Sequence, residues 1–364
     1  METHIYKEIQ KQHQEALFGT PFFEGSQGGG IHQNMSQSSY LEAGKEELNL
    51  YKPIRDKVTE YFTDEKISWW SQGGVTGNVL SSRVACLNHL FAVRDDKDLV
   101  RDIANALYGC PDFFMDVKKV NCDSGRNAQY IAFAVTSNDD YLHECKTETP
   151  QRGGANTTVD ALIIAADFDN KKYLLPIRWE YTEEYGRKTD KTKEGLLRYT
   201  NVHEGGDNLI GNSALLKPMP RNKYKGSIYF LEPFYQLMRQ TLWAEQLLKH
   251  KDQEVLKADV CCHIHIVPKD NVQLLYKGVR EKGYLDGERP TGCKPGMNMK
   301  DTWLHCLKSN DVQYKVVDPE VIADVLAKYV SVNSKAAELG SYLKYRYYGR
   351  IWKEAPKDTD PFHL

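Results

Sequence analysis

Apolar residues recur every three or four positions in several segments of the chain, and this spacing predicts helices that bury one face. Ser81 or Ser82 suits the N-cap of one such helix, since a serine hydroxyl can accept a hydrogen bond from a free backbone N–H group of the first turn. Another helix is predicted where Leu237, Met238 and Leu242 form one side of a long segment. The segments with this spacing are residues 1–18, 41–62, 80–92, 98–108, 229–250 and 319–329.

β-Branched and aromatic residues dominate several segments between these helices, which is typical of strands. Residues 113–120 and 129–136 are joined by a polar turn, so we expect them to form a hairpin. A second hairpin is predicted from the runs VDALIIAAD and YLLPIRWEY, which the turn DFDNKK connects. The run DVCCHIHIVP predicts one more buried strand. Together these elements predict an α/β protein with a mixed central sheet flanked by helices.

The second predicted hairpin brings charged side chains together. With its turn centred at Asp169 or Asn170, antiparallel partners have residue numbers that sum to about 338 to 340. Asp160 then lies opposite Arg178 or Glu180, and strand alternation places Arg178 and Glu180 on one face. Carboxylates presented in this way suit a divalent metal such as Mg²⁺, which prefers oxygen ligands and can activate water for phosphodiester hydrolysis.

The predicted order of the core elements is helix, strand, strand, strand, helix, strand, and this order resembles the core of the PD-(D/E)XK nucleases. The segments SSRVACLNHLF, RGGANTTVDAL, LLPIRWEYTEEY and EPFYQLMRQTLWAEQ are similar to those of a bacterial family of restriction-endonuclease-like proteins. The resemblance covers roughly residues 69–268. It predicts an N-terminal helical and loop segment (residues 1–68), this core, and a C-terminal extension packed on the core (residues 269–364).

The resemblance implies a metal-dependent endonuclease that hydrolyses phosphodiester bonds, in the first place those of DNA, in restriction or DNA processing. Asp160 and Glu180 would hold Mg²⁺ or Mn²⁺, and Arg178 would be an electrostatic helper in catalysis. The motif departs from the family pattern, because related members tend to read IEWKYTE where residues 177–183 read IRWEYTE. The expected Glu-x-Lys has become Arg-x-Glu, which moves the acid by roughly 6 to 7 Å along the strand.

This exchange leaves a second hypothesis open, in which the fold is kept and catalysis is lost. Asp160, Arg178 and Glu180 would then form a structural ion-pair network, and the chain would be a nucleic-acid or protein binding module. Arg178 cannot replace lysine as a proton-exchanging group near neutral pH, although it can orient water or bind phosphate. Binding of a divalent metal distinguishes the two hypotheses.

Four further residues are candidates for supporting the site or binding nucleic acid. Gln236 and Arg239 lie on the long helix that follows the motif strand, which can pack beside the metal-binding face. Lys188 and Lys191 belong to a basic segment, residues 187–198. Such a segment can contact the nucleic-acid backbone, because phosphate contacts add affinity without reading the base sequence.

Alternating histidines at His263 and His265 support a third and weaker hypothesis, a histidine-dependent nucleotide hydrolase. They resemble half of the histidine-triad motif, but Val267 stands where a third histidine is expected. Cys261 shares their strand face, without a fourth zinc ligand at a usual spacing. A plain strand at the edge of the core is the competing interpretation.

Composition narrows the remaining choices. The chain has 364 residues, of which 41% are hydrophobic, so it can bury a large core. Its formal net charge of -2 excludes a uniformly basic nucleic-acid binder and confines any such site to a local patch. The scattered cysteines without a CxxC pair, and the absence of an apolar signal or membrane span, predict a cytoplasmic protein. A homodimer is one arrangement that restriction-type enzymes adopt, although nothing in the sequence requires it.

Overall fold

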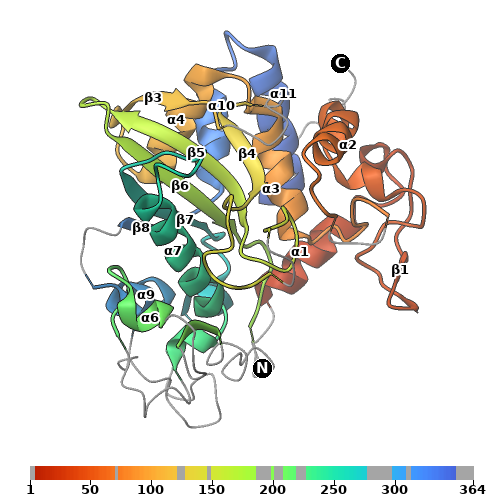
Figure 1. Ribbon diagram of the computed structural model, residues 1–364. Helices are drawn as coiled ribbons and strands as arrows, with labels where there is room; N and C mark the ends of the chain where they lie inside the picture. The colour runs from red at the N-terminus through yellow and green to blue at the C-terminus, as the bar shows by residue number, and fades with distance from the viewer. Residues whose placement is uncertain are drawn as a thin grey trace.

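One mixed β-sheet organises the chain, with helices on both of its faces (Figure 1). The computed structural model describes residues 5–69, 73–120, 128–145, 149–185, 198–200, 208–218, 227–276, 297–308 and 313–349. Within these residues the sheet has six strands: β3 Phe114–Lys118, β4 Ile131–Val135, β5 Val159–Asp167, β6 Lys172–Trp179, β7 Val260–Ile266 and β8 Gln313–Val317. The predicted α/β class with a mixed central sheet is confirmed.

The hairpin of β5 and β6 lies at the centre of this sheet, as the sequence predicts. Ala161 pairs with Ile177 and Ala166 pairs with Lys172, so the residue numbers of each pair sum to 338. Asn170 takes a left-handed conformation in the turn, with a φ of 60° that asparagine tolerates better than most residues. This register brings Asp160 level with Arg178.

The hairpin predicted from residues 113–120 and 129–136 is wrong. β3 and β4 both pair antiparallel with β5, and they lie end to end along it: Lys118 is opposite Ile164, and Ile131 is opposite Ile163. Only an isolated bridge between Val120 and Gln129 joins their ends within the described residues. β5 is nine residues long, so its backbone can pair with two short strands in succession. Strand composition identifies the strands, but it does not identify their partners.

The parallel part of the sheet consists of β6, β7 and β8. Because parallel strands end at the same edge, the residues that follow Trp179, Ile266 and Val317 gather there. β8 comes from the region C-terminal to residue 268 and extends the sheet beyond β7. This shared edge is where both sites described below are found.

The predicted helices are confirmed in the core. They are α1 Ile5–Glu15, α3 Ser82–Leu90, α4 Lys97–Tyr108, α7 Phe234–Lys249 and α10 Glu320–Lys328. Ser81 is the N-cap of α3, where its hydroxyl accepts from the backbone N–H of Val84. The order α3, β4, β5, β6, α7, β7 is the predicted helix, strand, strand, strand, helix, strand.

The region of residues 41–62 is less regular than its spacing predicts. It forms the 3-10 helices η2 Glu46–Asn49 and η3 Lys52–Ile54 before α2 Arg55–Asp64 begins. Pro53 explains the interruption, since proline lacks the N–H that a continuous helix needs. The remaining elements are η1 Pro21–Phe23, β1 Ile31–His32, β2 Met35–Ser36, η4 Phe91–Val93, α6 Leu209–Asn212, η7 Ile228–Phe230, α8 Val272–Tyr276, α9 Met299–Cys306, α11 Ser334–Leu343 and the π-helix η9 Lys344–Tyr348.

Strand alternation divides the core into two layers. Ala161, Ile163 and Ile177 pack with α3, α4, α10 and α11 on one face, whereas Leu162 and Leu174 pack with α7 and α9 on the other. Figure 1 shows α7 on one side of the sheet and α4, α10 and α11 on the opposite side. Arg178 and Glu180 therefore belong to the α7 face. No helix in the described ranges is both long and apolar enough to cross a membrane.

Arg346 joins the two ends of the described chain in the core. Its buried guanidinium donates to the Asn49 carbonyl at 2.5 Å, the Tyr342 hydroxyl at 2.7 Å and Gln14 Oε1 at 3.3 Å. A buried cation is tolerated only when its hydrogen bonds are made. Arg346 thus ties α1 and the loop before α2 to the C-terminal helices.

We expect Arg346→Met to lower the free energy of unfolding by about 2 to 4 kcal/mol, because buried acceptors lose their donor. Urea unfolding followed by tryptophan fluorescence measures the change. Lys344→Met on the same π-helix is the matched control, since Lys344 is partly exposed, and we expect less than about 1 kcal/mol there. Equal losses in the two variants would contradict the role given to Arg346.

Candidate functional site

Asp160 begins the site at the N-terminal end of β5. Its Oδ2 atom accepts a hydrogen bond from the backbone N–H of Trp179 at 2.8 Å, which holds the carboxylate against the end of β6. The side chain is nearly buried, with 9% of its surface exposed. The register of the hairpin is what brings this carboxylate to the end of β6, as the sequence predicts.

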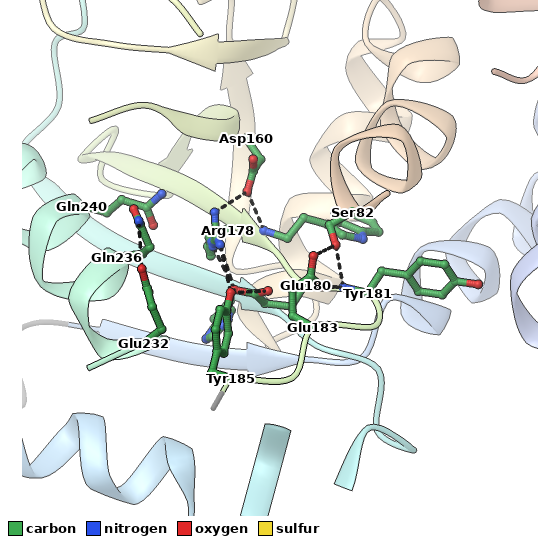
Figure 2. A network of polar contacts seen from close by, with 12 residues as sticks. Ser82, Asp160, Arg178, Glu180, Tyr181, Glu183, Tyr185, Glu232, Gln236 and Gln240 are labelled. Atoms are coloured by element: carbon green, nitrogen blue, oxygen red, sulfur yellow. Dashed lines mark hydrogen bonds and ion pairs between the residues drawn. The ribbon is translucent and has the colours of Figure 1, made fainter. Parts of the chain in front are cut away.

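Arg178 contacts both predicted acids. Its Nη1 atom is 3.7 Å from Asp160 Oδ2, and its Nε atom donates to Glu180 Oε1 at 3.0 Å. A second guanidinium approaches Asp160 from α3, where Arg83 Nε is 3.8 Å from Oδ1. Each oxygen of Asp160 therefore faces an arginine, and Figure 2 shows Asp160 and Arg178 joined in the same network as Glu180.

Glu180 lies at the inner end of this network and is fully buried. The Tyr185 hydroxyl is 2.9 Å from Glu180 Oε1 and 3.0 Å from Oε2, in addition to the contact with Arg178. Burial raises the pKa of Glu180, and Arg178 opposes this rise. His265 Nε2 is 3.8 Å from Oε1, but burial lowers the pKa of His265 to about 3, so the imidazole is neutral. Arg178 is therefore the cation that compensates Glu180.

Glu183 is a further acid of the site that the sequence does not single out. It accepts from the Ser82 hydroxyl and, at 2.5 Å, from the backbone N–H of Tyr181. Burial raises its pKa to about 8, and the charge of Glu180 adds to this rise. Glu183 is mostly protonated at neutral pH, because a second charge beside Glu180 is unfavourable. Its position after the end of β6 gives no periodic signal in the sequence.

An open cavity of about 490 Å³ adjoins these residues. Side chains from the start of α3, the ends of β5 and β6, and α7 converge on it. Its charged lining within the described residues is Arg83, Asp160, Arg178, Glu183 and Arg239, and its polar lining includes Asn156 and Gln236. Glu180 is not part of the lining, because Arg178 and Tyr185 cover its carboxylate.

The predicted supporting residues of α7 do reach this cavity. Arg239 Nε donates to Glu144 Oε1 at 2.8 Å, and its Nη1 donates to Gln236 Oε1 at 3.3 Å. Gln236 in turn donates to Glu232 at 3.2 Å. Glu144 is buried and also accepts from Tyr199 at 2.5 Å, so Arg239 is held in place from behind.

Two predicted residues cannot be placed in this geometry. Lys188 and Lys191 lie outside the described residues, so their contact with nucleic acid stays a prediction. His263 and His265 are described and buried on β7, and neither lines the cavity. His265 pairs with the Tyr314 hydroxyl at 2.8 Å, which favours a role in the core.

A site for Mg²⁺ would place a geometric requirement on these side chains. A divalent metal needs several oxygen ligands that converge on one point. Within the described chain no group of three or more His, Cys, Asp or Glu residues is arranged to hold a metal. Arg178 contacts both Asp160 and Glu180, so its guanidinium would have to move before an ion could bridge them. The use of Asp160 and Glu180 as metal ligands, and of Arg178 in catalysis, stays a prediction.

Comparison with known families agrees with this fold. The family model described as "Restriction Endonuclease associating with ARP" matches residues 12–348, and the chain belongs to this family. The match begins within α1 and covers the core and the C-terminal helices, so it confirms the expected restriction-endonuclease-like class. No curated protein and no solved structure matched the chain.

The raised pKa of Glu183 predicts how stability depends on pH. The folded protein binds this proton more tightly than the unfolded chain, whose carboxyl titrates near 4.5. The resulting contribution to stability is fully present below pH 4.5 and is lost as the pH rises through about 8. We expect Glu183→Gln to be at least about 1 kcal/mol more stable than the parent at pH 9 and to lose this advantage at pH 4.5.

Thermal unfolding of both proteins between pH 4.5 and 9 measures this difference. Glu60→Gln is the control, because Glu60 is an exposed carboxylate of α2, and we expect no pH-dependent change from it. A stability difference for Glu183→Gln that stays constant across this range would show that Glu183 has an ordinary pKa.

Proposed function

We propose that this chain is a nucleic-acid-binding protein built on the nuclease fold, which holds phosphate groups in the arginine-lined cavity and does not hydrolyse them. The observation that carries the proposal is the position of Arg178, at the end of β6 in contact with both Asp160 and Glu180. In the pattern expected for this family, an acid stands at that position and binds the metal. Here a permanent cation stands there instead.

The charges around the cavity favour an anion as its occupant. Arg83, Arg178 and Arg239 line it, whereas Glu180 and Glu144, which pair with Arg178 and Arg239, lie behind them in the core. The lining acids are Asp160 and Glu183, and burial raises the pKa of Glu183 to about 8. Guanidinium groups bind phosphate oxygens through paired hydrogen bonds. The surface of the cavity is therefore more attractive to phosphate than to Mg²⁺.

Loss of hydrolysis follows from the same side chains. A guanidinium does not exchange protons near neutral pH, so Arg178 cannot deliver or accept a proton at the scissile bond. Glu180 is buried behind it and is not part of the cavity lining. We infer that the site binds the backbone of DNA and holds it without cutting.

A metal-dependent endonuclease is the second candidate function. It is favoured by membership of a restriction-endonuclease family and by the two carboxylates, Asp160 and Glu183, that do line the cavity. In that case Mg²⁺ or Mn²⁺ would activate water, and Arg178 would bind the phosphate. Asp160 is required for this candidate, so the two functions can be separated by experiment.

Partners of the chain are also proposed from the family. The family description names an association with ARP, and we propose that this chain takes part in such an association. DNA is the proposed nucleic acid, and the basic residues Lys188 and Lys191 would extend its contact with the backbone. A homodimer stays a prediction that size measurement in solution can test.

The phosphate-binding role predicts the effect of removing one lining cation. We expect Arg83→Ala to weaken binding of a short DNA duplex about tenfold at low salt, because one charge-assisted contact is lost. Fluorescence anisotropy in EDTA measures this affinity without any metal. Arg101→Ala on the surface of α4, which pairs with Asp98 and Asp102, is the control and should bind like the parent. Equal affinity of parent and Arg83→Ala would exclude the cavity as the DNA site.

The altered motif predicts the outcome of a nicking assay. We expect the parent protein to leave supercoiled plasmid intact in Mg²⁺ or Mn²⁺, and the double variant Arg178→Glu with Glu180→Lys to nick it, because that exchange restores the expected order of acid and lysine. Adding Asp160→Ala to the double variant should abolish nicking. Nicking by the parent protein that disappears in Asp160→Ala would contradict our proposal and establish the endonuclease.

A further inference from the structure

A second pocket lies on the opposite face of β6 from the arginine-lined cavity. Trp179 and Tyr181 line it, and strand alternation turns them away from Arg178 and Glu180. The pocket is found where the parallel strands β6, β7 and β8 end, because residues 268–270 and 318–320 complete its wall. Such an edge is where open α/β sheets often bind ligands. We call it the tyrosine pocket.

Aromatic side chains form much of the tyrosine pocket. Tyr6 of α1, Tyr347 and Tyr348 of η9, and Trp179 line it together with His89 of α3. The His89 ring lies 4.7 Å from the ring centre of Trp179, and its Nε2 is 2.8 Å from the Tyr348 hydroxyl. Burial lowers the pKa of His89 to about 3, so this ring is neutral and contributes no positive charge. The walls are therefore fixed by packing and by hydrogen bonds.

Carboxylates give the tyrosine pocket a negative charge. Asp270, Asp318 and Glu320 line it, and Lys269 is the one cation among the described residues of its lining. Lys269 is 3.1 Å from Asp318 and also contacts Glu320. Within the described chain, no cation lies at ion-pair distance from Asp270. The three carboxylates and one ammonium group give the described lining of the pocket a formal charge of -2.

Tyr6 is an independent sign that the pocket lacks a partner. Its side chain is 93% buried, counted from 7% exposure, yet its hydroxyl makes no hydrogen bond within the described part of the chain. Burial raises the pKa of Tyr6, and the nearby Tyr181, Asp270 and Asp318 raise it further. The Tyr6 hydroxyl is not among the fully buried polar atoms that lack a partner, so it is open to the pocket, where an ammonium group can donate a hydrogen bond to its oxygen.

The size and chemistry of the pocket restrict its ligand. Its volume of about 50 Å³ holds a small head group and excludes a nucleobase or a sugar. Among the described residues its carboxylates do not form a metal-binding group. Aromatic faces combined with carboxylates attract organic cations, through the negative face of each ring and direct ion pairing. We propose that the tyrosine pocket binds one alkylammonium or guanidinium group, supplied by a free amine or by a basic side chain of a partner.

Calorimetric titration of the full-length protein at low salt tests this site with three probes. These are n-butylammonium, the capped tripeptide Gly-Lys-Gly, and the same tripeptide with norleucine in place of lysine. We expect the ammonium probes to bind and the uncharged norleucine peptide not to bind. Tighter binding of the peptide than of n-butylammonium identifies a protein side chain as the ligand, and the reverse order identifies a small amine.

Two variants connect this binding to the pocket. We expect Asp270→Asn, an exposed change that leaves the core intact, to weaken binding of the ammonium probes at least fivefold, and Tyr6→Phe to weaken it while keeping the ring. Asp252→Asn is the matched control, because Asp252 is an exposed carboxylate outside the pocket lining, and it should bind like the parent. Equal binding of the lysine and norleucine peptides, no binding at millimolar concentration, or unchanged affinity in Asp270→Asn would each overturn the proposal. The site lies on the other sheet face from the arginine-lined cavity, so neither result depends on DNA binding.

Discussion

Arg178 carries a buried positive charge to the point where β6 ends, and two carboxylates compensate it from either side. Removing Arg178 would leave the fully buried Glu180 without its compensating cation, and an uncompensated buried charge costs several kcal/mol. Asp160 is drawn to β6 both by this charge and by the backbone N–H of Trp179. The ion pairs and the hairpin register therefore stabilise each other, and the shape of the cavity depends on both.

The strand β6 separates two chemically opposite environments. Arg178 in this strand and Glu180 just after it belong to a face where guanidinium groups line a cavity of about 490 Å³. Trp179 at its end and Tyr181 just after it line a smaller pocket of aromatic rings and carboxylates. Successive side chains of a strand point to opposite faces of the sheet. This alternation is sufficient to place an anion-binding surface and a cation-binding surface on the two faces of the same strand. A protein that binds both nucleic acid and a basic partner needs such a separation of charge.

Several residues of the site could be predicted from the sequence, and others could not. The turn DFDNKK set the hairpin register, so the meeting of Asp160 with Arg178 and Glu180 could be predicted. Gln236 and Arg239 followed from the position of α7 after the motif strand. Arg83 and Glu183 did not, because they come from other segments and reach Asp160 and Ser82 only in the folded chain. Tyr185 likewise reaches Glu180 through a loop whose path has no periodic pattern.

By itself the sequence determined the α/β class, the helices α1, α3, α4, α7 and α10, the strands β3 to β7, and which side chains near the end of β6 share a face. These features are local, since hydrophobic periodicity and turn residues act over a few positions. The tertiary structure alone decided that β3 and β4 pair end to end with β5, and that Glu180 is buried behind Arg178. It also decided that residues from α1, α3, β6 and the C-terminal helices build one pocket. The pairing of strands and the burial of side chains depend on contacts between segments that are far apart in the sequence. The free energy of those contacts cannot be inferred from a short stretch of residues.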